Sequence, residues 1–549
     1  MLTDKLARSE GRASLQALFL RAALLPLLLL QAVSPAPVAG RTGAAGRPPA
    51  LTYDELLTLY DRETPPEPLR RKLQSLLTTP FVSNEATERG TRPAAPRSER
   101  LGRFLRVVQW NVERGLEYEA IEAAFVSPHR FAELIDGADY RPGSPARAAA
   151  LEQAAMLQAA DIVVLNEVDW GLKRTGYRNV AADLAAALGM NYAFGVEFVE
   201  VDPIALGIEK FTGEEAGGDK ALAEQIRVDP ERYLGLHGTA ILSRYPLENV
   251  RLVPFKFQGH DWYADERKGR SPLEKGRRKA SEVAFRTKTG REVRRGGRMM
   301  LLADISDPAF PGGRLTVVAT HLEAKTKPAN RVRQLREVLD EIAGVRHAVV
   351  LAGDMNTSTR DDTPTSLARE FKKRLGSRKF WAEQLVKHTT GFTLPFGFVR
   401  GGINHYRKQG DPTVRHVPFV AANPEAKFFT ELKEFRFADG GAFDFRGDED
   451  RSSGTAGTLS NSNERGGKGF ATTYEVERAI GFVGKFKLDW IFVKPPVSPA
   501  GEPGAGSQTY RFAPHFGRTL KELNFSFPDR ISDHSPLLVD LPLEEPPRL

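Results

Sequence analysis

The sequence predicts an α/β fold. Short apolar runs rich in Val, Ile and Leu, which are typical of buried strands, alternate with segments that carry apolar residues at helical spacing. A second observation is that polar residues repeatedly stand at the ends of the apolar runs. The alternation begins near residue 103 and extends over roughly 440 residues, so we expect one α/β domain interrupted by insertions.

Seven runs are predicted as strands, because each is too short for a helix and is rich in aliphatic residues. They are residues 105–108, 162–165, 240–242, 315–319, 348–351, 488–493 and 537–541. Helices are predicted between them at residues 147–158, 180–188 and 331–342, where apolar residues recur every three or four positions.

Residues 1–40 have the pattern of an export signal. Basic residues precede the apolar stretch 22–30, and small residues follow it. The stretch is shorter than the roughly 20 residues that span a bilayer. We therefore expect an exported protein, periplasmic or extracellular; the alternatives are an uncleaved N-terminal anchor and a start codon placed too early.

Residues 41–102 are rich in Pro, Ala and Arg, which is typical of a linker. Two short helical patterns, at residues 51–60 and 69–77, interrupt it. We expect them to pack on the main domain, residues 103–545, as an N-terminal appendage.

Composition excludes several classes of site. The 549 residues include no cysteine, which rules out disulfides, a thiol nucleophile, thiolate-bound zinc and iron–sulfur clusters. Hydrophobic residues make up 41% of the chain, enough for a folded core. The net charge of +8 is concentrated: residues 251–300 hold 15 Lys and Arg against 6 Asp and Glu, so the remainder is nearly neutral. This single basic segment favours an anionic partner.

Polar side chains stand at the ends of six predicted strands. They are Asn111, Asn166 with Glu167, His321, Asp354 with Asn356, Asp489, and Asp533 with His534. Ligand sites in α/β sheets favour the carboxyl ends of strands, and the start of an antiparallel strand reaches the same edge. One Asp or Asn at a strand end is usually a turn residue. Six such places in order predict a polar cluster on one edge of mixed sheets.

The chemistry of this cluster is narrow. Carboxylate and amide oxygens without thiolates suit a hard divalent cation, which we expect to be Mg²⁺, with Mn²⁺ and Ca²⁺ as alternatives. Imidazoles handle protons or bind phosphate oxygens near neutral pH. A hard cation beside acid–base groups indicates hydrolysis of a phosphate ester.

At this point the residues resemble a known family, the endonuclease/exonuclease/phosphatase superfamily. It includes deoxyribonuclease I, neutral sphingomyelinases and inositol polyphosphate 5-phosphatases. The motifs that carry the resemblance are Gln109-Trp110-Asn111-Val112, Leu165-Asn166-Glu167-Val168, Gly238 to Arg244, Thr320-His321-Leu322, Gly353-Asp354-Met355-Asn356, Leu488-Asp489-Trp490-Ile491 and Ser532-Asp533-His534-Ser535-Pro536. The resemblance spans about residues 103–543. It implies a four-layer α/β/β/α sandwich of two mixed β-sheets.

The resemblance also implies roles for the metal and water groups. Glu167 resembles the principal Mg²⁺ ligand, with Asn111 and Asp533 near the metal. Asp354 and Asn356 resemble the pair that orients the attacking water and contacts the scissile phosphate. The proton of that water passes either to Asp354 or to the histidine of the terminal motif, and the sequence leaves both open.

The same resemblance implies that Asp489 orients His534, which acts as general base or transition-state stabiliser. His321 matches the histidine that faces the phosphate in the deoxyribonuclease I and sphingomyelinase branches, and argues against the repair-endonuclease branch, where a tyrosine stands. The acid that partners this histidine is not obvious, and Glu197 is the candidate. His237 either joins the site or is a buried, hydrogen-bonded core histidine.

Substrate specificity is expected in three insertions, at about residues 201–236, 251–298 and 391–487. The basic one predicts contacts to a polyanion through Arg277, Arg278, Arg294 and Arg295. Nucleic acid is the favoured substrate of this expected phosphodiesterase. A phosphomonoesterase or lipid phosphodiesterase is the alternative, with the aromatic segment 392–398 as a membrane-entering tip. A non-catalytic anion-binding protein is the second alternative. We expect a monomer without an obligate protein partner.

Overall fold

The computed structural model describes residues 48–135, 139–203, 205–208, 228–267, 292–357, 425–446, 472–480, 483–497, 509–527 and 530–546. The chain divides into two units, and all described residues belong to the second, Arg47–Leu549. Within these ranges, no helix has the length and apolarity needed to cross a membrane. The expected export signal, Arg277, Arg278 and the aromatic segment 392–398 lie outside the described residues.

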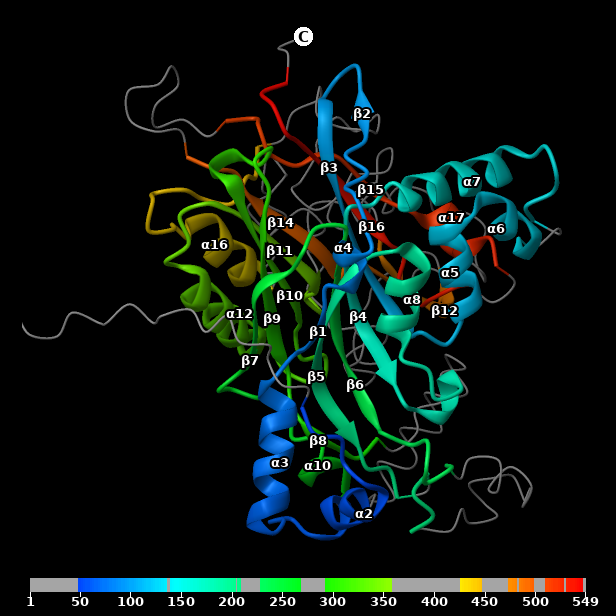
Figure 1. Cartoon of the computed structure of the whole chain (residues 1–549), viewed down its shortest axis with the longest axis vertical. Helices are drawn as coiled ribbons and strands as arrows, with labels where there is room; N and C mark the ends of the chain where they lie inside the picture. Colours follow the sequence, from blue (N-terminus) through cyan, green and yellow to red (C-terminus); the bar gives the residue numbers. More distant parts are fainter. Residues whose placement is uncertain are drawn as a thin grey trace, which may run out of the picture. The chain divides into compact units, whose positions relative to one another are not determined.

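Two mixed sheets form the centre of this unit (Figure 1). The strands of the larger sheet are β1 Phe81–Ser83, β2 Arg97–Ser98, β3 Gly102–Arg114, β4 Ile162–Trp170, β5 Asn191–Glu200, β6 Leu236–Ser243, β8 Arg294–Gly296, β15 His515–Thr519 and β16 Leu537–Pro542. Their order is β1-β5-β6-β4-β3-β16-β15, with β2 beside β3 and β8 beside β5. Strands β3 and β4 are parallel, and the other pairs are antiparallel.

The smaller sheet has the order β14-β11-β10-β9-β7. Its strands are β7 Glu248–Pro254, β9 Met299–Ser306, β10 Arg314–His321, β11 Ala348–Asp354 and β14 Asp489–Lys494. Only β10 and β11 among them are parallel. Strands β12 Tyr474–Ile480 and β13 Val483–Phe486 form a separate antiparallel pair.

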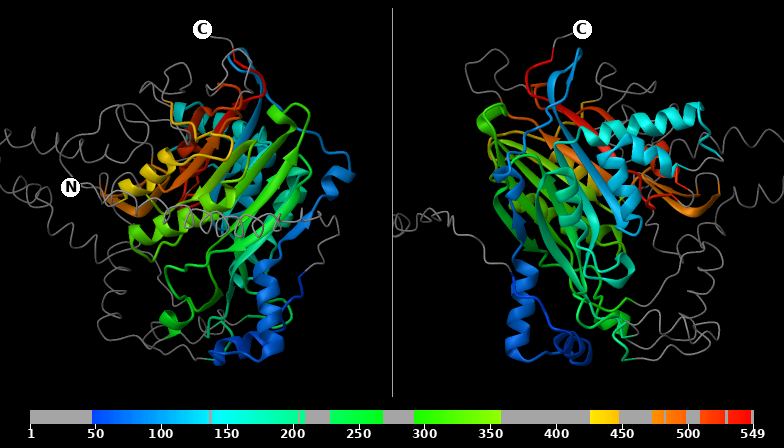
Figure 2. Two further views of the ribbon diagram at one scale, coloured as in Figure 1. Left: turned by 90° about the vertical axis from the view of Figure 1, so that its left-hand side faces the viewer. Right: turned by 45° about the vertical axis from the view of Figure 1, so that its right-hand side comes forward.

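Helices cover the outer faces of both sheets (Figure 1, Figure 2). The α-helices are α2 Tyr53–Asp61, α3 Glu67–Thr78, α4 Glu85–Glu88, α5 Tyr118–Val126, α6 Pro128–Leu134, α7 Pro145–Gln158, α8 Val180–Leu188, α10 Ala264–Arg267, α12 Pro328–Ile342, α16 Ala426–Glu434 and α17 Lys521–Phe525; η1 Lys173–Thr175 and η2 Pro311–Gly313 are 3₁₀ turns. Local signals set their ends: Ser144 caps α7, and α8 runs from an Asn179 cap to Gly189 in the left-handed conformation.

Alternation along the central strands produces the layers. Leu105 and Val107 of β3 face the second sheet and pack in one cluster with Val317 of β10. Val108 and Trp110 point the other way, into a cluster with residues of α5, α7 and α8. A third cluster joins the smaller sheet to α12 and α16. Strands buried on both faces explain why the runs are almost wholly apolar. The predicted α/β/β/α sandwich is confirmed, and all seven predicted runs correspond to strands, although Leu488 lies just before β14.

The segment expected to be a linker contributes to this core. Its two helical patterns correspond to α2 and α3, and Leu56, Leu59 and Leu76 are fully buried. Phe81 then opens β1, which pairs with β5 as the last strand on that side of the larger sheet. From about residue 51 the chain is therefore part of the packed unit rather than a tether.

A buried amide joins the two sheets at the end where the polar residues gather. The Nδ2 of Asn166 on β4 donates to Thr320 O on β10 at 3.1 Å, and also to Thr239 Oγ1 at 3.0 Å. Its Oδ1 accepts from Asp354 N at 2.9 Å and from Gln109 Nε2 at 3.1 Å. The same side chain thus satisfies polar groups of both sheets where water is excluded.

We predict that Asn166→Leu, which keeps the volume but none of these hydrogen bonds, destabilises the fold by about 1–3 kcal/mol for each buried group left unpaired. Denaturant unfolding measures the effect. Asn330→Leu, at a half-buried position on α12, is the control and is expected to change stability much less. Equal losses in the two variants would contradict a special role for the cross-sheet amide.

Candidate active site

The predicted residues meet around a cavity of 160 Å³ at one edge of the two sheets. The predicted side chains that line it are Glu167, Arg294, His321, Asp354, Asn356, Asp533 and His534. Asn111 and Asp489 stand behind them: Asn111 Nδ2 lies 3.1 Å from Asp354 Oδ2, and Asp489 bonds to His534. Asn111 and His534 are 423 residues apart in the sequence, and the pairing of β16 with β3 brings their segments together.

Strand register sets the spacing of three of these groups. His321 on β10 pairs with Asp354 on β11, and Asp354 pairs with Asp489 on β14. The three residues therefore form one row across neighbouring strands of the smaller sheet. In the larger sheet Asn111 of β3 pairs with Asn166 of β4. Because β14 is antiparallel to β11, its first residue reaches the edge where β10 and β11 end.

A β-bulge turns Glu167 into the cavity. In a regular strand Glu167 would share the face of Leu165, which packs against the helices. Strand β4 instead places two residues, Asn166 and Glu167, opposite the single residue Thr239 of β6, and Glu167 has φ +52°. A positive φ in a non-glycine residue costs about 1–3 kcal/mol and concentrates at functional sites. Asn356 is held in the same way, at φ +46°.

Asp489 and His534 form a buried dyad. Nδ1 of His534 donates to Asp489 Oδ2 at 2.7 Å, and Gln109 Nε2 donates to the other oxygen of Asp489 at 3.1 Å. Nε2 of His534 then faces Asp354 Oδ2 at 3.8 Å and Asp533 Oδ1 at 3.9 Å. Burial disfavours the imidazolium, but the three surrounding carboxylates prevail and raise the pKa of His534 well above its ordinary value.

Carboxylates crowd together next to His534. Burial, and then the charge of Asp489, raise the pKa of Asp354 to about 7; burial and Asp533 raise that of Glu113 likewise to about 7. Burial also raises the pKa of Asp533. Glu167 differs, because Arg114 and nearby cationic groups outweigh its burial and lower its pKa. Several carboxylate oxygens lie close enough together to raise one another's pKa values. Such a set of oxygen donors suits a hard divalent cation.

Asp354, Asp489 and His534 also satisfy a simple geometric test for a metal site, with one potential ligand atom from each lying within 4.8 Å of the others. Both oxygens of Asp489 are already engaged, by Gln109 and His534. Glu167, Asp533 and the Oδ1 of Asn111 have fewer protein partners, and they fit a cation better. Oδ1 of Asn111 accepts one hydrogen bond, from Glu113 N at 3.1 Å, which leaves it a second lone pair.

His321 has a basic partner rather than an acidic one. Arg298 Nη1 donates to its Nδ1 at 2.8 Å, while its Nε2 lies 3.4 Å from Asp354 Oδ2. Burial, and then the charge of Arg298, lower the pKa of His321 well below its ordinary value. Glu197, the candidate acid, contacts Arg298 at 2.6 Å instead of the ring. His237 is buried and bonds to Asp169 at 2.8 Å, and it also lines the cavity.

Of the two predicted arginines that the structure describes, Arg294 lines the cavity and Arg295 does not. Arg294 is buried there, with its guanidinium 3.0 Å from Glu200 Oε1 and 2.7 Å from Glu292 Oε2. Arg295 instead donates to backbone carbonyls around the end of α2, including Leu59 O at 2.8 and 2.9 Å, and its guanidinium covers the Tyr263 ring. The N–H groups of Arg295 thus bind the end of α2, and the side chain does not line the cavity.

Several cavity residues were not among the predicted site residues. They are Arg114, Trp262, Glu292, Arg298, Lys325 and Tyr474. Of these residues Arg114 lies closest to a predicted motif, and it follows Asn111 by three positions. The others lie in segments where many residues of the same type compete, and only the fold selects among them.

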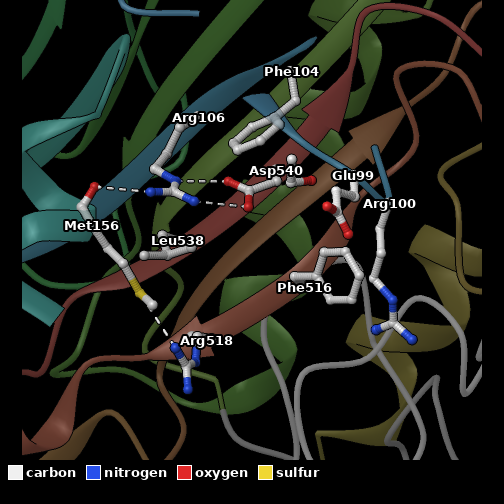
Figure 3. Close-up of a pocket in the computed structure, with 10 residues that line it drawn as sticks. Glu99, Arg100, Phe104, Arg106, Met156, Phe516, Arg518, Leu538 and Asp540 are labelled. Carbon is white, nitrogen blue, oxygen red and sulfur yellow. Dashed lines mark hydrogen bonds and ion pairs between the residues drawn. The ribbon is translucent and has the colours of Figure 1, made fainter. Parts of the chain in front are cut away.

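A larger cavity, of 420 Å³, lies near the start of β3 and has different chemistry (Figure 3). Its floor is apolar, with Phe104 and Leu538. Arg106 is paired with both oxygens of Asp540, at 2.7 and 2.9 Å. Its lining residues include no histidine, whereas the smaller cavity combines histidines with carboxylates.

The chain is similar to several solved structures. A structure of an endonuclease/exonuclease/phosphatase from Beutenbergia cavernae is 18% identical, over 80% of this chain and 71% of that one, with a TM-score of 0.35. The human Nocturnin catalytic domain is 13% identical over 80% and 92%, with a TM-score of 0.32. An AP endonuclease from Archaeoglobus fulgidus is 13% identical over 80% and 99%, with a TM-score of 0.33. No curated protein matches the chain.

The family model of the endonuclease/exonuclease/phosphatase family matches residues 108–534, from the first of the polar motifs to the last. That span contains the whole of the smaller sheet and, in the larger sheet, β4, β5, β6, β8, β15 and most of β3. The chain therefore belongs to the endonuclease/exonuclease/phosphatase family.

Proposed function

We propose that this protein is an exported, Mg²⁺-dependent phosphodiesterase that cleaves its substrate by attack of water, with nucleic acid as the favoured substrate and the monomer as the working form. The observation that carries the proposal is the position of Asp354. One carboxylate oxygen, Oδ2, lies 3.4 Å from His321 Nε2 and 3.8 Å from His534 Nε2, beside the crowded carboxylates. Membership of a family of phosphoesterases supports the reaction class.

Asp354 is the group that we assign to the proton of the attacking water. A raised pKa of about 7 makes it a stronger base than an ordinary carboxylate. His534 is less suited to that task, because Asp489 and its neighbours favour the ring in its protonated form. An imidazolium at that position donates a hydrogen bond to the phosphoryl group, whose negative charge grows in the transition state.

Glu167, Asp533 and Asn111 are the residues that would hold the cation. When bound, a hard divalent cation neutralises charge on phosphoryl oxygens. The protein's own contribution is to desolvate these side chains and fix their directions: Asn111 Nδ2 orients Glu167 Oε1 at 3.3 Å, and Glu113 Oε2 holds the backbone N–H of Asp533 at 2.9 Å.

The basic insertion supports nucleic acid as the substrate. Residues 251–300 carry the net positive charge of the chain, and both flanks of this segment reach the site, through Trp262 and Arg294. A phosphodiester backbone is the polyanion that such a segment attracts over a distance. The competing candidates are a small phosphate monoester and a lipid phosphodiester.

A substrate panel on the full chain tests the proposal. It comprises plasmid DNA, RNA, a chromogenic phosphodiester, inositol phosphates and sphingomyelin, each with Mg²⁺ and with a chelator. Cation-dependent cleavage of DNA or RNA supports it. Turnover of sphingomyelin or inositol phosphates without nucleic-acid cleavage would establish the alternative, and no turnover at all would favour an anion-binding protein.

We predict that Asp354→Asn and His534→Gln each lower kcat about 10²–10⁴-fold, because the first removes the carboxylate that takes the proton of the water and the second removes the imidazolium that donates to the phosphoryl group. The chromogenic phosphodiester provides the rate, and circular dichroism shows whether the variants fold. Asp183→Asn, on the half-exposed surface of α8, is the control and should keep the wild-type rate. Near-normal turnover by either site variant would contradict its assignment.

Cation affinity should rise with pH. Glu113 and Asp354 have raised pKa values of about 7, so below that pH they hold protons that oppose the cation, and above it they present free carboxylates. We predict tighter Mg²⁺ binding at pH 8 than at pH 6, with proton release that is greatest near pH 7. Isothermal titration calorimetry in two buffers of different ionisation enthalpy measures both quantities, and affinity that is independent of pH would contradict the coupling.

A further inference from the structure

The two histidines that flank Asp354 have partners of opposite character. Nδ1 of His534 meets a carboxylate, Asp489 Oδ2, at 2.7 Å. Nδ1 of His321 meets a guanidinium, Arg298 Nη1, at 2.8 Å. Both rings then direct Nε2 toward the same oxygen, Oδ2 of Asp354. The partner of each Nδ1 therefore decides what each ring presents to the cavity.

A guanidinium can only donate. Arginine keeps its proton in proteins, and none of its nitrogens accepts a hydrogen bond. The contact with Arg298 therefore requires an unprotonated Nδ1 on His321, and the single proton of the neutral ring must then reside on Nε2. This tautomer presents an N–H donor to the cavity.

The neighbouring amide makes the opposite demand on the ring. As placed, Asn356 Nδ2 lies 3.0 Å from His321 Nε2 and also donates to Leu322 O at 3.0 Å. A donor at that point would suit a lone pair on Nε2. The guanidinium decides between them, because a hydrogen bond from a charged donor is roughly twice as strong as one between neutral groups. With a proton on Nε2 the ring no longer accepts from the Asn356 amide, which keeps its hydrogen bond to Leu322 O.

Arg298 has no freedom to withdraw from the ring. Its side chain is buried, with Nη1 bonded to Glu197 Oε2 at 2.6 Å and Nε 3.5 Å from Glu323 Oε2. Glu197 is fixed in turn by Thr239 Oγ1 at 2.5 Å, and Thr239 accepts from Asn166 at 3.0 Å. Because Asn166 also binds the backbone N–H of Asp354, a continuous chain of hydrogen bonds connects the Asp354 backbone to the ring of His321.

We propose that Arg298 is a positioning residue that locks His321 as its Nε2–H tautomer, so that His321 serves the reaction as a hydrogen-bond donor to a phosphoryl oxygen and not as a base. The catalytic part of this inference rests on the proposed phosphoesterase function. The tautomer does not, because it follows from the Arg298 contact alone. Glu197 acts one step further away, by holding Arg298.

The first test is spectroscopic and needs no substrate. Long-range ¹H–¹⁵N correlation of the full chain labelled with ¹⁵N-histidine distinguishes the two tautomers, and His321→Gln identifies the His321 signals among those of the ten histidines. We expect Nε2–H in the wild type and a shift toward Nδ1–H in Arg298→Met. Nδ1–H in the wild type would overturn the proposal.

The second test is kinetic and includes a rescue. Residues that orient a catalytic group through one contact typically contribute 10–100-fold, so we expect Arg298→Met to lower kcat by about that factor with little change in KM. Arg298→Lys, which keeps a cationic donor, should recover part of the loss. In a His321→Gln background, which already replaces the ring by an amide donor, Arg298→Met should cost much less.

A folding defect is separable from a positioning defect. Arg298→Met leaves the buried carboxylate of Glu197 without its cation, which can destabilise the fold. The double variant Arg298→Met/Glu197→Gln removes that charge, and the His321 ring still lacks its contact with residue 298. The proposal is overturned if the folded double variant retains both the Nε2–H tautomer and the wild-type kcat. If the wild type itself hydrolyses no substrate of the panel, the proposed function fails while the tautomer measurement still decides the role of Arg298.

Discussion

The cross-sheet hydrogen bonds of Asn166 are the constraint on which the rest of the site depends. Two sheets packed through aliphatic side chains have no directional force that fixes one strand end opposite another, because hydrophobic burial is non-directional. Asn166 supplies that force, since it binds Thr320 O and Asp354 N of one sheet and Thr239 and Gln109 of the other. Glu167 on β4 and Asp354 on β11 are thereby held in one geometry.

Electrostatics then divides the roles of groups that are chemically alike. Glu167 and Asp354 are both buried carboxylates, but Arg114 lowers the pKa of the first, while burial and Asp489 raise that of the second. These opposite shifts suit the roles proposed for them, Glu167 as a ligand of the cation and Asp354 as the base. The position of Glu167 has a conformational cost, because the β-bulge interrupts the regular geometry of β4 and gives Glu167 a positive φ. Matching bulges on β3 and β5 at the same level keep the neighbouring strands paired.

The α/β class followed from the alternation of the runs, the four-layer arrangement from the family resemblance, and six of the side chains that line the candidate cavity from polar residues at strand ends. A strand buried on two faces must be apolar, and a polar residue that ends it is conspicuous. The basic residues were less accessible. Arg294 and Arg295 are adjacent on β8, so their side chains point to opposite faces, and only one reaches the cavity. In a strand of only three residues, a run of basic residues does not show which of the two arginines faces the cavity. Arg298 was hidden in the same run.

The Arg298 contact shows why a histidine in a family motif does not by itself define a role. A carboxylate at Nδ1 makes the ring a donor toward that carboxylate and leaves Nε2 to accept or to carry a second proton. A guanidinium at Nδ1 reverses this, and Nε2 becomes a donor only. His534 and His321 occupy these two situations on either side of one Asp354 oxygen. The chemistry of each ring is thus determined by a neighbour that lies outside its own motif and that only the folded chain brings into contact.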